Sequence, residues 1–433
     1  MSSGSTRTFR SGLNARLAVV LFAAAVGAGF FWMNYLPQHS RMVWLDRINA
    51  NPWPSRYVDL KILLAGIECD RLGMNVWVTC PCGAESMGLK NVPFNYPKAI
   101  LWLGRLVPFR LSVADGDWLG PVLIVAFLLV LSFSFHGTTF WQAAYFCALI
   151  ASPPVLFAIE RANYDLALFC LIFLNVSFLD RLSNAGSYAV TFGLGMLKLY
   201  PIAAVLGLIR KTKNSRILFW LTVAAEAIFI IFSFNNIRVV ANLTPRMTWQ
   251  SFGYAIVFLI VSGRFKALAW VTKIMLPIFV AVLVTLTYST WRARQYWLCI
   301  LNGGDMKYRS LFIAGGAIYS VCFAFGANFN YRFVFLLFTV PYLFSMQRVN
   351  SPQRSTAGLI LITLLCAFWL TAIDGRTSVK LLQAGMTWLL FIFFASLCLT
   401  VSFDSLLEKT TARTLVEGNR TPASGAVANR SPV

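Results

Sequence analysis

Long apolar runs separated by short polar loops fill most of this chain. The stretch "LAVVLFAAAVGAGFFWMNYL" lies near the N-terminus, and "LLFIFFASLCLTV" lies near the C-terminus. Apolar runs that recur in this way reach the ~17–25 residues that a helix needs to cross the hydrocarbon core of a bilayer. The pattern predicts an all-α polytopic membrane protein.

The apolar runs predict about ten full transmembrane helices. The expected spans are residues 17–36, 118–136, 140–159, 165–180, 216–234, 268–289, 308–326, 331–346, 356–373 and 379–402. Together they form a single transmembrane domain, residues 16–402. The polar stretches on either side, residues 1–15 and 403–433, are expected to be disordered.

One apolar segment, "SYAVTFGLGMLKLYPIAAVLGLIR", does not fit a simple span because Lys198 and Pro201 interrupt its middle. A single crossing would also place the basic residues after it outside, although Lys and Arg favour cytoplasmic loops. Two half-helices that enter the membrane and return satisfy both constraints, since broken backbone is tolerated where protein buries it. We expect a re-entrant broken hairpin with Lys198 near its tip.

The first external loop, residues 37–117, is long and mixed in composition. Its amphipathic stretches fit helices that lie at the membrane interface. The Lys and Arg bias of the other loops places both termini in the cytoplasm. The same topology places "ERANYD", "GANFNYR" and "IDGRTS" on the external side with this loop.

Composition agrees with a membrane protein. Of 433 residues, 58% are hydrophobic and 12% are charged, and the mean hydropathy is +0.68. Soluble domains carry about 25% charged residues. The net charge of +21 is spread over short loops without a patch of interleaved aromatic residues. The charge therefore indicates topology and membrane lipids as neighbours, and it argues against a nucleic-acid partner.

Cysteine and histidine usage gives no clear metal site. Five of the nine cysteines lie in apolar segments, where cysteine packs as a small hydrophobic residue. Cys69, Cys80 and Cys82 lie in the external loop, where a disulfide from Cys69 to one of the other two is one alternative. The motif "TCPCG" lacks the second ligand pair of a typical zinc site, and the chain has only two histidines. No cofactor is assigned, and a divalent metal stays an open alternative.

Two external segments contain candidates for acid–base chemistry and phosphate binding. Asp59 begins an amphipathic stretch of the long loop, where a shielded carboxylate could act as a general base or could simply complement a helix dipole. In "ERANYD", Arg161 could hold a phosphate by two parallel hydrogen bonds, with Glu160 as its orienting partner. Asn163 or Asp165 could cap the following helix, and Asp165 is expected to act mainly as a cap.

Two more cations lie at a predicted break and at the start of a predicted span. Lys198 belongs to "KLYP", and Arg332 follows Tyr331 in "NFNYR". Each could snorkel to the interface, or each could bind an anionic headgroup. An ionisable residue at membrane depth favours the functional alternative.

Together these motifs resemble the GT-C class of integral-membrane glycosyltransferases, in particular the bacterial group related to polyprenyl-phosphate-mannose-dependent mannosyltransferases. That group carries an Asp-led amphipathic helix, a "YP" helix start, an "ERGN-x-D" turn, a "KLYP" break and an "N-x-x-YR" span start. The corresponding residues here are Asp59, Tyr96 with Pro97, and residues 160–165, 198–201 and 328–332. The resemblance covers residues 17–346, and Ala162 replaces the glycine of the turn.

The resemblance implies a GT-C-like fold in a bacterial plasma membrane and a transfer reaction at its external face. A sugar on a polyprenyl phosphate would be the donor, and a hydroxyl of a glycan or lipid would be the acceptor. Asp59 would be the base of an inverting reaction. The phosphate would be stabilised by Arg161, Arg332 and Lys198, and the wider set of substrate-binding or phosphate-binding residues would add Glu160, Asn163 and Tyr331. The alternative is a transporter or flippase for a lipid-linked or small anionic substrate, because such proteins also use broken helices.

Overall fold

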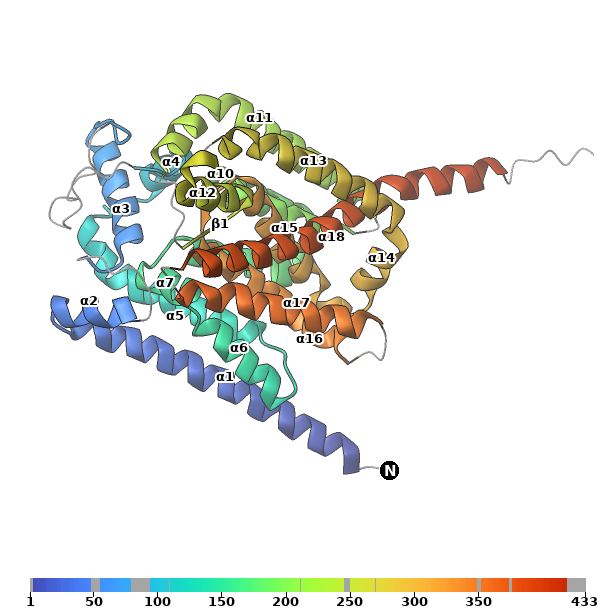
Figure 1. Ribbon diagram of the computed structural model, residues 1–433, viewed down its shortest axis with the longest axis horizontal. Coiled ribbons are helices and arrows are strands. Elements are labelled where there is room, and N and C mark those ends of the chain that lie inside the picture. Colours follow the sequence, from blue (N-terminus) through green and yellow to red (C-terminus); the bar gives the residue numbers. More distant parts are fainter. Residues whose placement is uncertain are drawn as a thin grey trace, which may run out of the picture.

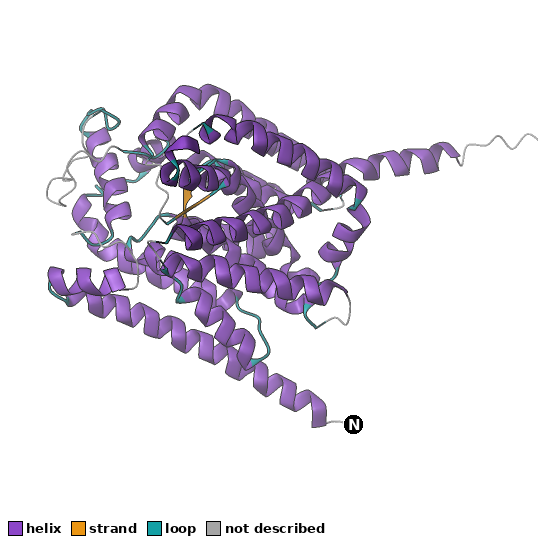
Figure 2. Cartoon of the chain, viewed as in Figure 1, coloured by secondary structure: helices purple, strands orange, loops and turns teal. Residues whose placement is uncertain are grey.

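The computed structural model describes residues 3–47, 55–78, 94–108, 110–210, 212–244, 250–268, 270–348, 352–373 and 376–418. These residues are almost entirely helical (Figure 2). The exception is a small antiparallel sheet in which β1 (Ser251–Phe252) pairs with β2 (Asn328–Phe329). The all-α prediction therefore holds, apart from this short connection between two distant loops.

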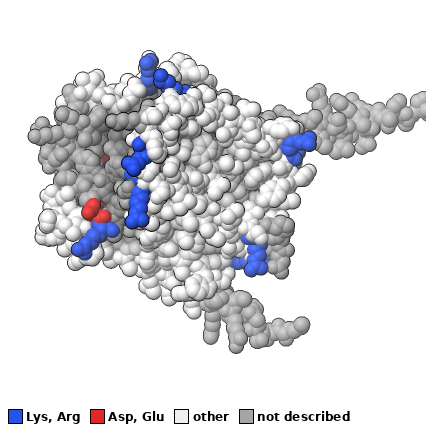
Figure 3. Space-filling view, viewed as in Figure 1, with Lys and Arg blue, Asp and Glu red and all other residues white. Residues whose placement is uncertain are grey.

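Six helices in the described part of the chain are long and apolar enough to cross a membrane. They are α1 (Ser3–Tyr35), α5 (Gly116–Ser134), α11 (Lys213–Leu243), α13 (Val271–Arg292), α17 (Pro352–Trp369) and α18 (Thr377–Gly418). A seventh span exists if α6 (Phe140–Ile150) and α7 (Pro153–Glu160), which are bent by 53° at their junction, count as one. The chain is a multi-pass membrane protein. On the face in Figure 3, most of the described surface carries neither Lys, Arg, Asp nor Glu, as expected where lipid surrounds a protein.

The predicted count of ten full spans is too high by this measure. Residues 165–180 form α8 (Asp165–Leu174), the π turn η3 (Asn175–Leu179) and the start of α9 (Asp180–Leu182). Residues 308–326 belong to α15 (Met306–Ala324), whose first turns are polar, and residues 331–346 form the 3₁₀ helix η6 (Asn330–Thr339) and α16 (Val340–Met346). Apolar side chains in these segments are mostly buried inside the protein. Hydropathy alone cannot separate such core helices from helices that face lipid.

Helix α15 lies at the centre of the bundle and packs against η6, α18 and the 3₁₀ helix η4 (Tyr200–Leu208) (Figure 1). Aromatic rings fill this core. Phe323 stacks on Phe391 of α18 with ring centroids 4.4 Å apart, and Phe312 stacks on Tyr342 at 4.4 Å. Offset ring pairs of this kind add stability beyond the burial of their area. The tight core therefore fixes both ends of α15.

The break predicted at Lys198 joins two antiparallel helical segments. These two legs are α10 (Asn184–Leu197) and η4, and Lys198 and Leu199 form the link between them. The hydroxyl of Tyr188, near the start of α10, donates a hydrogen bond to the carbonyl of Leu208 at the end of η4, at 3.2 Å. The two legs therefore run antiparallel, with Lys198 at the tip. Gly207 allows η4 to approach α15, since an added Cβ would collide with the backbone of Ser310.

The long first loop contains α2 (Gln38–Arg47), α3 (Val58–Arg71), α4 (Lys98–Leu106) and the short 3₁₀ helix η2 (Val113–Asp115). Helices α3 and α4 pack together over a small apolar cluster that includes Ile67, Phe94 and Leu101. Cys69 of α3 is disulfide-bonded, and Cys80 and Cys82 lie outside the described residues. This loop is therefore attached to the bundle by buried contacts.

The remaining helices are short: α12 (Tyr254–Arg264), η5 (Lys266–Leu268), α14 (Arg294–Asn302) and η7 (Leu370–Ala372). Helix α12 packs on α13 and α18. At the two ends of the chain, α1 begins at Ser3 and α18 continues to Gly418, where the sequence predicts disorder. In Figure 1 the last part of α18 extends beyond the bundle.

Candidate functional site

The turn between α7 and α8 presents the polar residues of "ERANYD". Ala162 has a φ of 44°, in the left-handed region that glycine adopts most easily. This conformation explains why a glycine suits the turn, and Ala162 holds it at some cost in strain. Asn163 follows, and its side-chain oxygen accepts a hydrogen bond from the backbone N–H of Asp165 at 2.9 Å. The Asn163 side chain therefore satisfies the first backbone N–H of α8.

The carboxylate of Asp59 is held by two residues of this turn. Arg161 Nη1 donates to Oδ1 at 3.0 Å, and Asn163 Nδ2 donates to Oδ2 at 2.5 Å. The side chains of Asp59 and Arg161 are each 12% exposed. The hydroxyl of Tyr96 also donates to the backbone carbonyl of Asp59, at 3.4 Å. Burial, reinforced by the charge of Asp59, holds the pKa of Tyr96 well above its ordinary value, so Tyr96 stays protonated and remains a donor.

Asp165 is the centre of a second group of charges. Its side chain is completely buried and accepts hydrogen bonds from Lys198 Nζ and from the hydroxyl of Tyr200. Arg332 Nε lies 3.7 Å from the other carboxylate oxygen. The expectation that Asp165 is mainly a helix cap misses this role. Asp165 is the shared counter-ion of two cations that arrive from the hairpin tip and from η6.

Aromatic rings surround both cations. Lys198 Nζ lies 5.0 Å from the ring centre of Tyr164, 5.4 Å from that of Tyr200 and 6.0 Å from that of Tyr96. The guanidinium of Arg332 lies 5.1 Å from the ring centre of Tyr200 and 5.8 Å from that of Tyr331. The negative faces of aromatic rings attract cations within ≈ 6 Å, and the attraction is stronger away from water. The rings thus hold the cations in place without neutralising them.

Glu160 forms an ion pair that the sequence did not indicate. Its carboxylate lies 3.8 Å from Arg41 of α2, and both side chains are 3% exposed. Burial lowers the pKa of Arg41, and the charge of Glu160 opposes this effect. The expected orienting partner of Arg161 is Glu160. In the structure, Asp59 binds Arg161, whose guanidinium also lies over the ring of Phe157 at 4.4 Å. Glu160 instead attaches the interfacial helix α2 to α7.

A cavity of about 380 Å³ opens beside the cations and is called the amphipathic cavity below. Its polar end contains Lys198 and Arg332, and its remaining wall is largely apolar. The apolar wall comes from α11, α12 and α13 through Ile237, Val240, Leu259 and Met275. A smaller polar recess of about 50 Å³, lined by Tyr96, Tyr331 and Ser251, shares Lys198 and Arg332 with it. The two hollows therefore meet at the two cations.

The predicted site residues divide into two layers. Lys198, Arg332 and Tyr331 line the hollows. The four others, Asp59, Glu160, Arg161 and Asn163, do not line either hollow and form a buried layer behind it. Asn163 connects the two layers. Its side-chain nitrogen donates to Asp59, and its side-chain oxygen accepts a hydrogen bond from the backbone N–H of Asp165. Tyr96 and Tyr331 both line the recess, and Tyr96 also donates a hydrogen bond to the backbone carbonyl of Asp59.

The five motifs of the sequence converge on this place, although they span residues 59 to 332. Tyr96 and Tyr200 stand in two of those motifs but were not singled out as site residues. Asn95, which lines both hollows, was also missed and directly precedes the "YP" motif. Within the described residues, no three His, Cys, Asp or Glu side chains gather as metal ligands. Asp374 of "IDGRTS" lies outside the described part of the chain.

In comparisons with protein-family models, with curated proteins and with solved structures, this chain has no match. The geometry of the site is therefore the basis for any functional proposal.

Proposed function

We propose that the protein is a membrane glycosyltransferase that takes a sugar from a polyprenyl-phosphate donor and transfers it to an acceptor hydroxyl. The observation that carries the proposal is the pairing of Lys198 and Arg332 at the polar end of a cavity with apolar walls. A lipid phosphate has the same two-part character. Its phosphate fits the cations, and its hydrocarbon fits the wall of Ile237, Val240 and Met275.

The charges at the cations favour an anion. Lys198 and Arg332 share one carboxylate, that of Asp165. Two positive charges therefore share one negative charge, and the remaining positive charge lies at the wall of the cavity. Preorganised cations that face a developing negative charge are usually the largest single contribution to such transfers. In this proposal they stabilise the phosphate as it leaves the sugar.

The acceptor hydroxyl is placed in the polar recess, near Tyr96 and Tyr331. Its oxygen attacks the anomeric carbon and forms the new glycosidic bond. The bond from that carbon to the phosphate oxygen breaks, and its electron pair stays on the phosphate. The hydroxyl proton passes to the carboxylate of Asp59. Because Asp59 does not line the recess, this step requires its carboxylate to leave Arg161 and Asn163 and turn toward the acceptor.

Binding and transfer can be tested separately with purified protein in nanodiscs. We expect Arg332→Gln to weaken binding of a short-chain polyprenyl phosphate by tenfold or more, because a charge-assisted contact is worth about 1.5–3 kcal/mol. Arg105→Gln is the matched control, since Arg105 lies on α4, is 55% exposed and pairs with Asp70. Equal affinity in all three proteins would rule out the assignment of the phosphate site.

Transfer is tested with membranes that contain polyprenyl-phosphate hexoses. Asp59→Asn should abolish sugar transfer while leaving polyprenyl phosphate binding within a few-fold of the original protein. Unchanged transfer by a normally expressed Asp59→Asn variant would exclude Asp59 as the base. Tight binding of the lipid by the original protein without any transfer would favour movement of a lipid-linked substrate across the membrane instead.

A further inference from the structure

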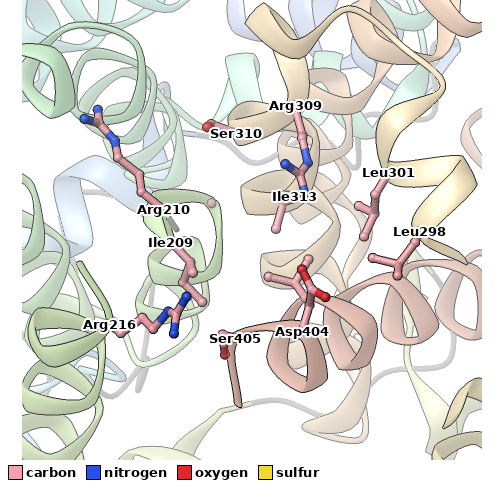
Figure 4. Close-up of a pocket in the computed structure, with 12 residues that line it drawn as sticks. Ile209, Arg210, Arg216, Leu298, Leu301, Arg309, Ser310, Ile313, Asp404 and Ser405 are labelled. Atoms are coloured by element: carbon pink, nitrogen blue, oxygen red, sulfur yellow. The ribbon is translucent and has the colours of Figure 1, made fainter. Parts of the chain in front are cut away.

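A second polar cavity, of about 70 Å³, lies at the other end of α15. It forms where the end of η4, the start of α11, α14, the first turns of α15 and the last buried part of α18 meet (Figure 4). Arg210, Arg216 and Arg309 are among the residues that line it, and Asp404 contributes one carboxylate. We call it the arginine pocket. Helix α15 has 19 residues and is about 28 Å long, and the amphipathic cavity lies beyond its other end.

Most of the charges at the arginine pocket have internal partners. Arg210 donates to Asp180, at 2.5 Å to the carboxylate and 2.8 Å to the carbonyl. Asp404 accepts from Arg294 at 2.6 Å. In Figure 4 the guanidinium of Arg210 extends away from the other labelled residues, consistent with its pairing to Asp180.

Arg309 differs from these residues. Among the described residues it makes no ion pair, and its Nε is buried without a hydrogen-bond acceptor. A buried donor without a partner is costly, and charged donors are the most costly. Among the described residues that line the pocket, Asp404 is the one carboxylate, and it already binds Arg294. The pocket therefore contains a buried guanidinium donor, that of Arg309, which no described carboxylate satisfies.

The size and chemistry of the pocket fit one tetrahedral oxyanion. Guanidinium groups bind phosphate oxygens through parallel hydrogen bonds. A volume of about 70 Å³ leaves no room for a sugar beside the phosphate. Leu298 and Ile313 supply apolar contacts at the edge of the pocket. An anion with hydrocarbon attached matches this lining better than a free ion does.

The location favours a membrane lipid as the source of the phosphate. By the distribution of Lys and Arg, this end of α15 faces the cytoplasm. The cytoplasmic leaflet is rich in anionic lipids, and basic pockets between transmembrane helices on that side bind their headgroups. We propose that the arginine pocket binds the phosphate group of an anionic phospholipid and that Arg309 is its principal ligand. The proposal is independent of any glycosyltransferase activity.

The test is lipid retention by the full-length protein. Nanodiscs containing phosphatidylglycerol and phosphatidylcholine are dissolved in detergent, and the lipids that stay bound are identified by native mass spectrometry. We expect the original protein to retain phosphatidylglycerol in preference to phosphatidylcholine, and Arg309→Gln to weaken this retention by roughly tenfold. The control is Arg105→Gln, which removes the same charge from an exposed site on α4. Equal retention by the original protein and Arg309→Gln would overturn the proposal.

A second variant should strengthen lipid retention, which a simple loss of folding could not do. Asp404→Asn removes the one carboxylate of the lining and releases Arg294, so it should strengthen phosphatidylglycerol retention severalfold. Weaker retention by Asp404→Asn would contradict an electrostatic site. Inorganic phosphate provides a second comparison. If phosphate alone raises the apparent Tm of the original protein as much as phosphatidylglycerol does, and no lipid is retained, the phospholipid assignment is wrong.

Discussion

The two ends of α15 differ in how their buried cations are paired. At the end near the amphipathic cavity, Lys198 and Arg332 share Asp165, and Arg161 binds Asp59. At the end with the arginine pocket, Arg309 has no carboxylate partner within the described structure. Buried counter-ions fix cations in position before a ligand arrives. A cation without one depends on an anion from outside the chain. The first arrangement suits a reaction site, and the second suits a resident lipid.

The largest effect is expected when the shared counter-ion is removed. Asp165→Asn leaves Lys198 and Arg332 buried without a carboxylate, so we expect a loss of about 3–5 kcal/mol in stability. The apparent Tm of the purified protein in detergent measures this loss. Asp117→Asn is the matched control because Asp117 pairs with Lys61 at 2.7 Å but is 62% exposed. Exposed pairs contribute only about 0.2–1 kcal/mol. Similar shifts in both variants would show that burial does not distinguish the two pairs.

Replacing a buried carboxylate that has no partner should raise the stability of the protein, whereas replacing Asp165 should lower it. Glu226 of α11 is 3% exposed, lies against Gly195 of α10 and has no hydrogen-bond partner for either oxygen among the described residues. An unsatisfied buried polar group costs about 1–3 kcal/mol, so replacing it with an apolar side chain of similar size, in Glu226→Met, should raise stability by up to that amount. Asp165→Asn and Glu226→Met both remove a buried carboxylate, but of the two only Asp165 has cations bound to it among the described residues. A fall in apparent Tm would indicate that the Glu226 carboxyl has a partner or function of its own.

Much of the site could be predicted from the sequence because charges are rare in so apolar a chain. Lys198 and Arg332 stand out for that reason, and the break at "KLYP" predicts the hairpin that carries Lys198. Which charges would pair could not be predicted. Glu160 and Arg161 are neighbours in sequence, yet the ion pair of Glu160 is with Arg41 and that of Arg161 is with Asp59. Adjacent residues point in different directions, and their partners come from distant segments.

The number of spans was harder to predict for a related physical reason. Lipid and protein core are both apolar, so η6 has the same composition as a lipid-facing helix although its apolar residues are buried. Glu226 was missed because a single carboxyl within a long apolar run hardly changes the hydropathy. Only the packing of α11 on α10 shows that its side chain faces protein.

The smallest effect is expected in the turn between α7 and α8, where Asn163 contacts both Asp59 and Asp165. Ala162 and Ala158 are both fully buried, but only Ala162 has a left-handed φ, whereas Ala158 lies in α7. Ala158→Gly should cost roughly 1–2 kcal/mol through lost helix propensity and a lost buried methyl group. Ala162→Gly loses the same methyl group but relieves roughly 1–2 kcal/mol of backbone strain, so its stability should stay close to that of the original protein. Thermal unfolding of the two variants side by side isolates the strain. If Ala162→Gly lowers the apparent Tm as much as Ala158→Gly does, the turn stores no strain, and the conformation that brings Asn163 between Asp59 and Asp165 is held without cost.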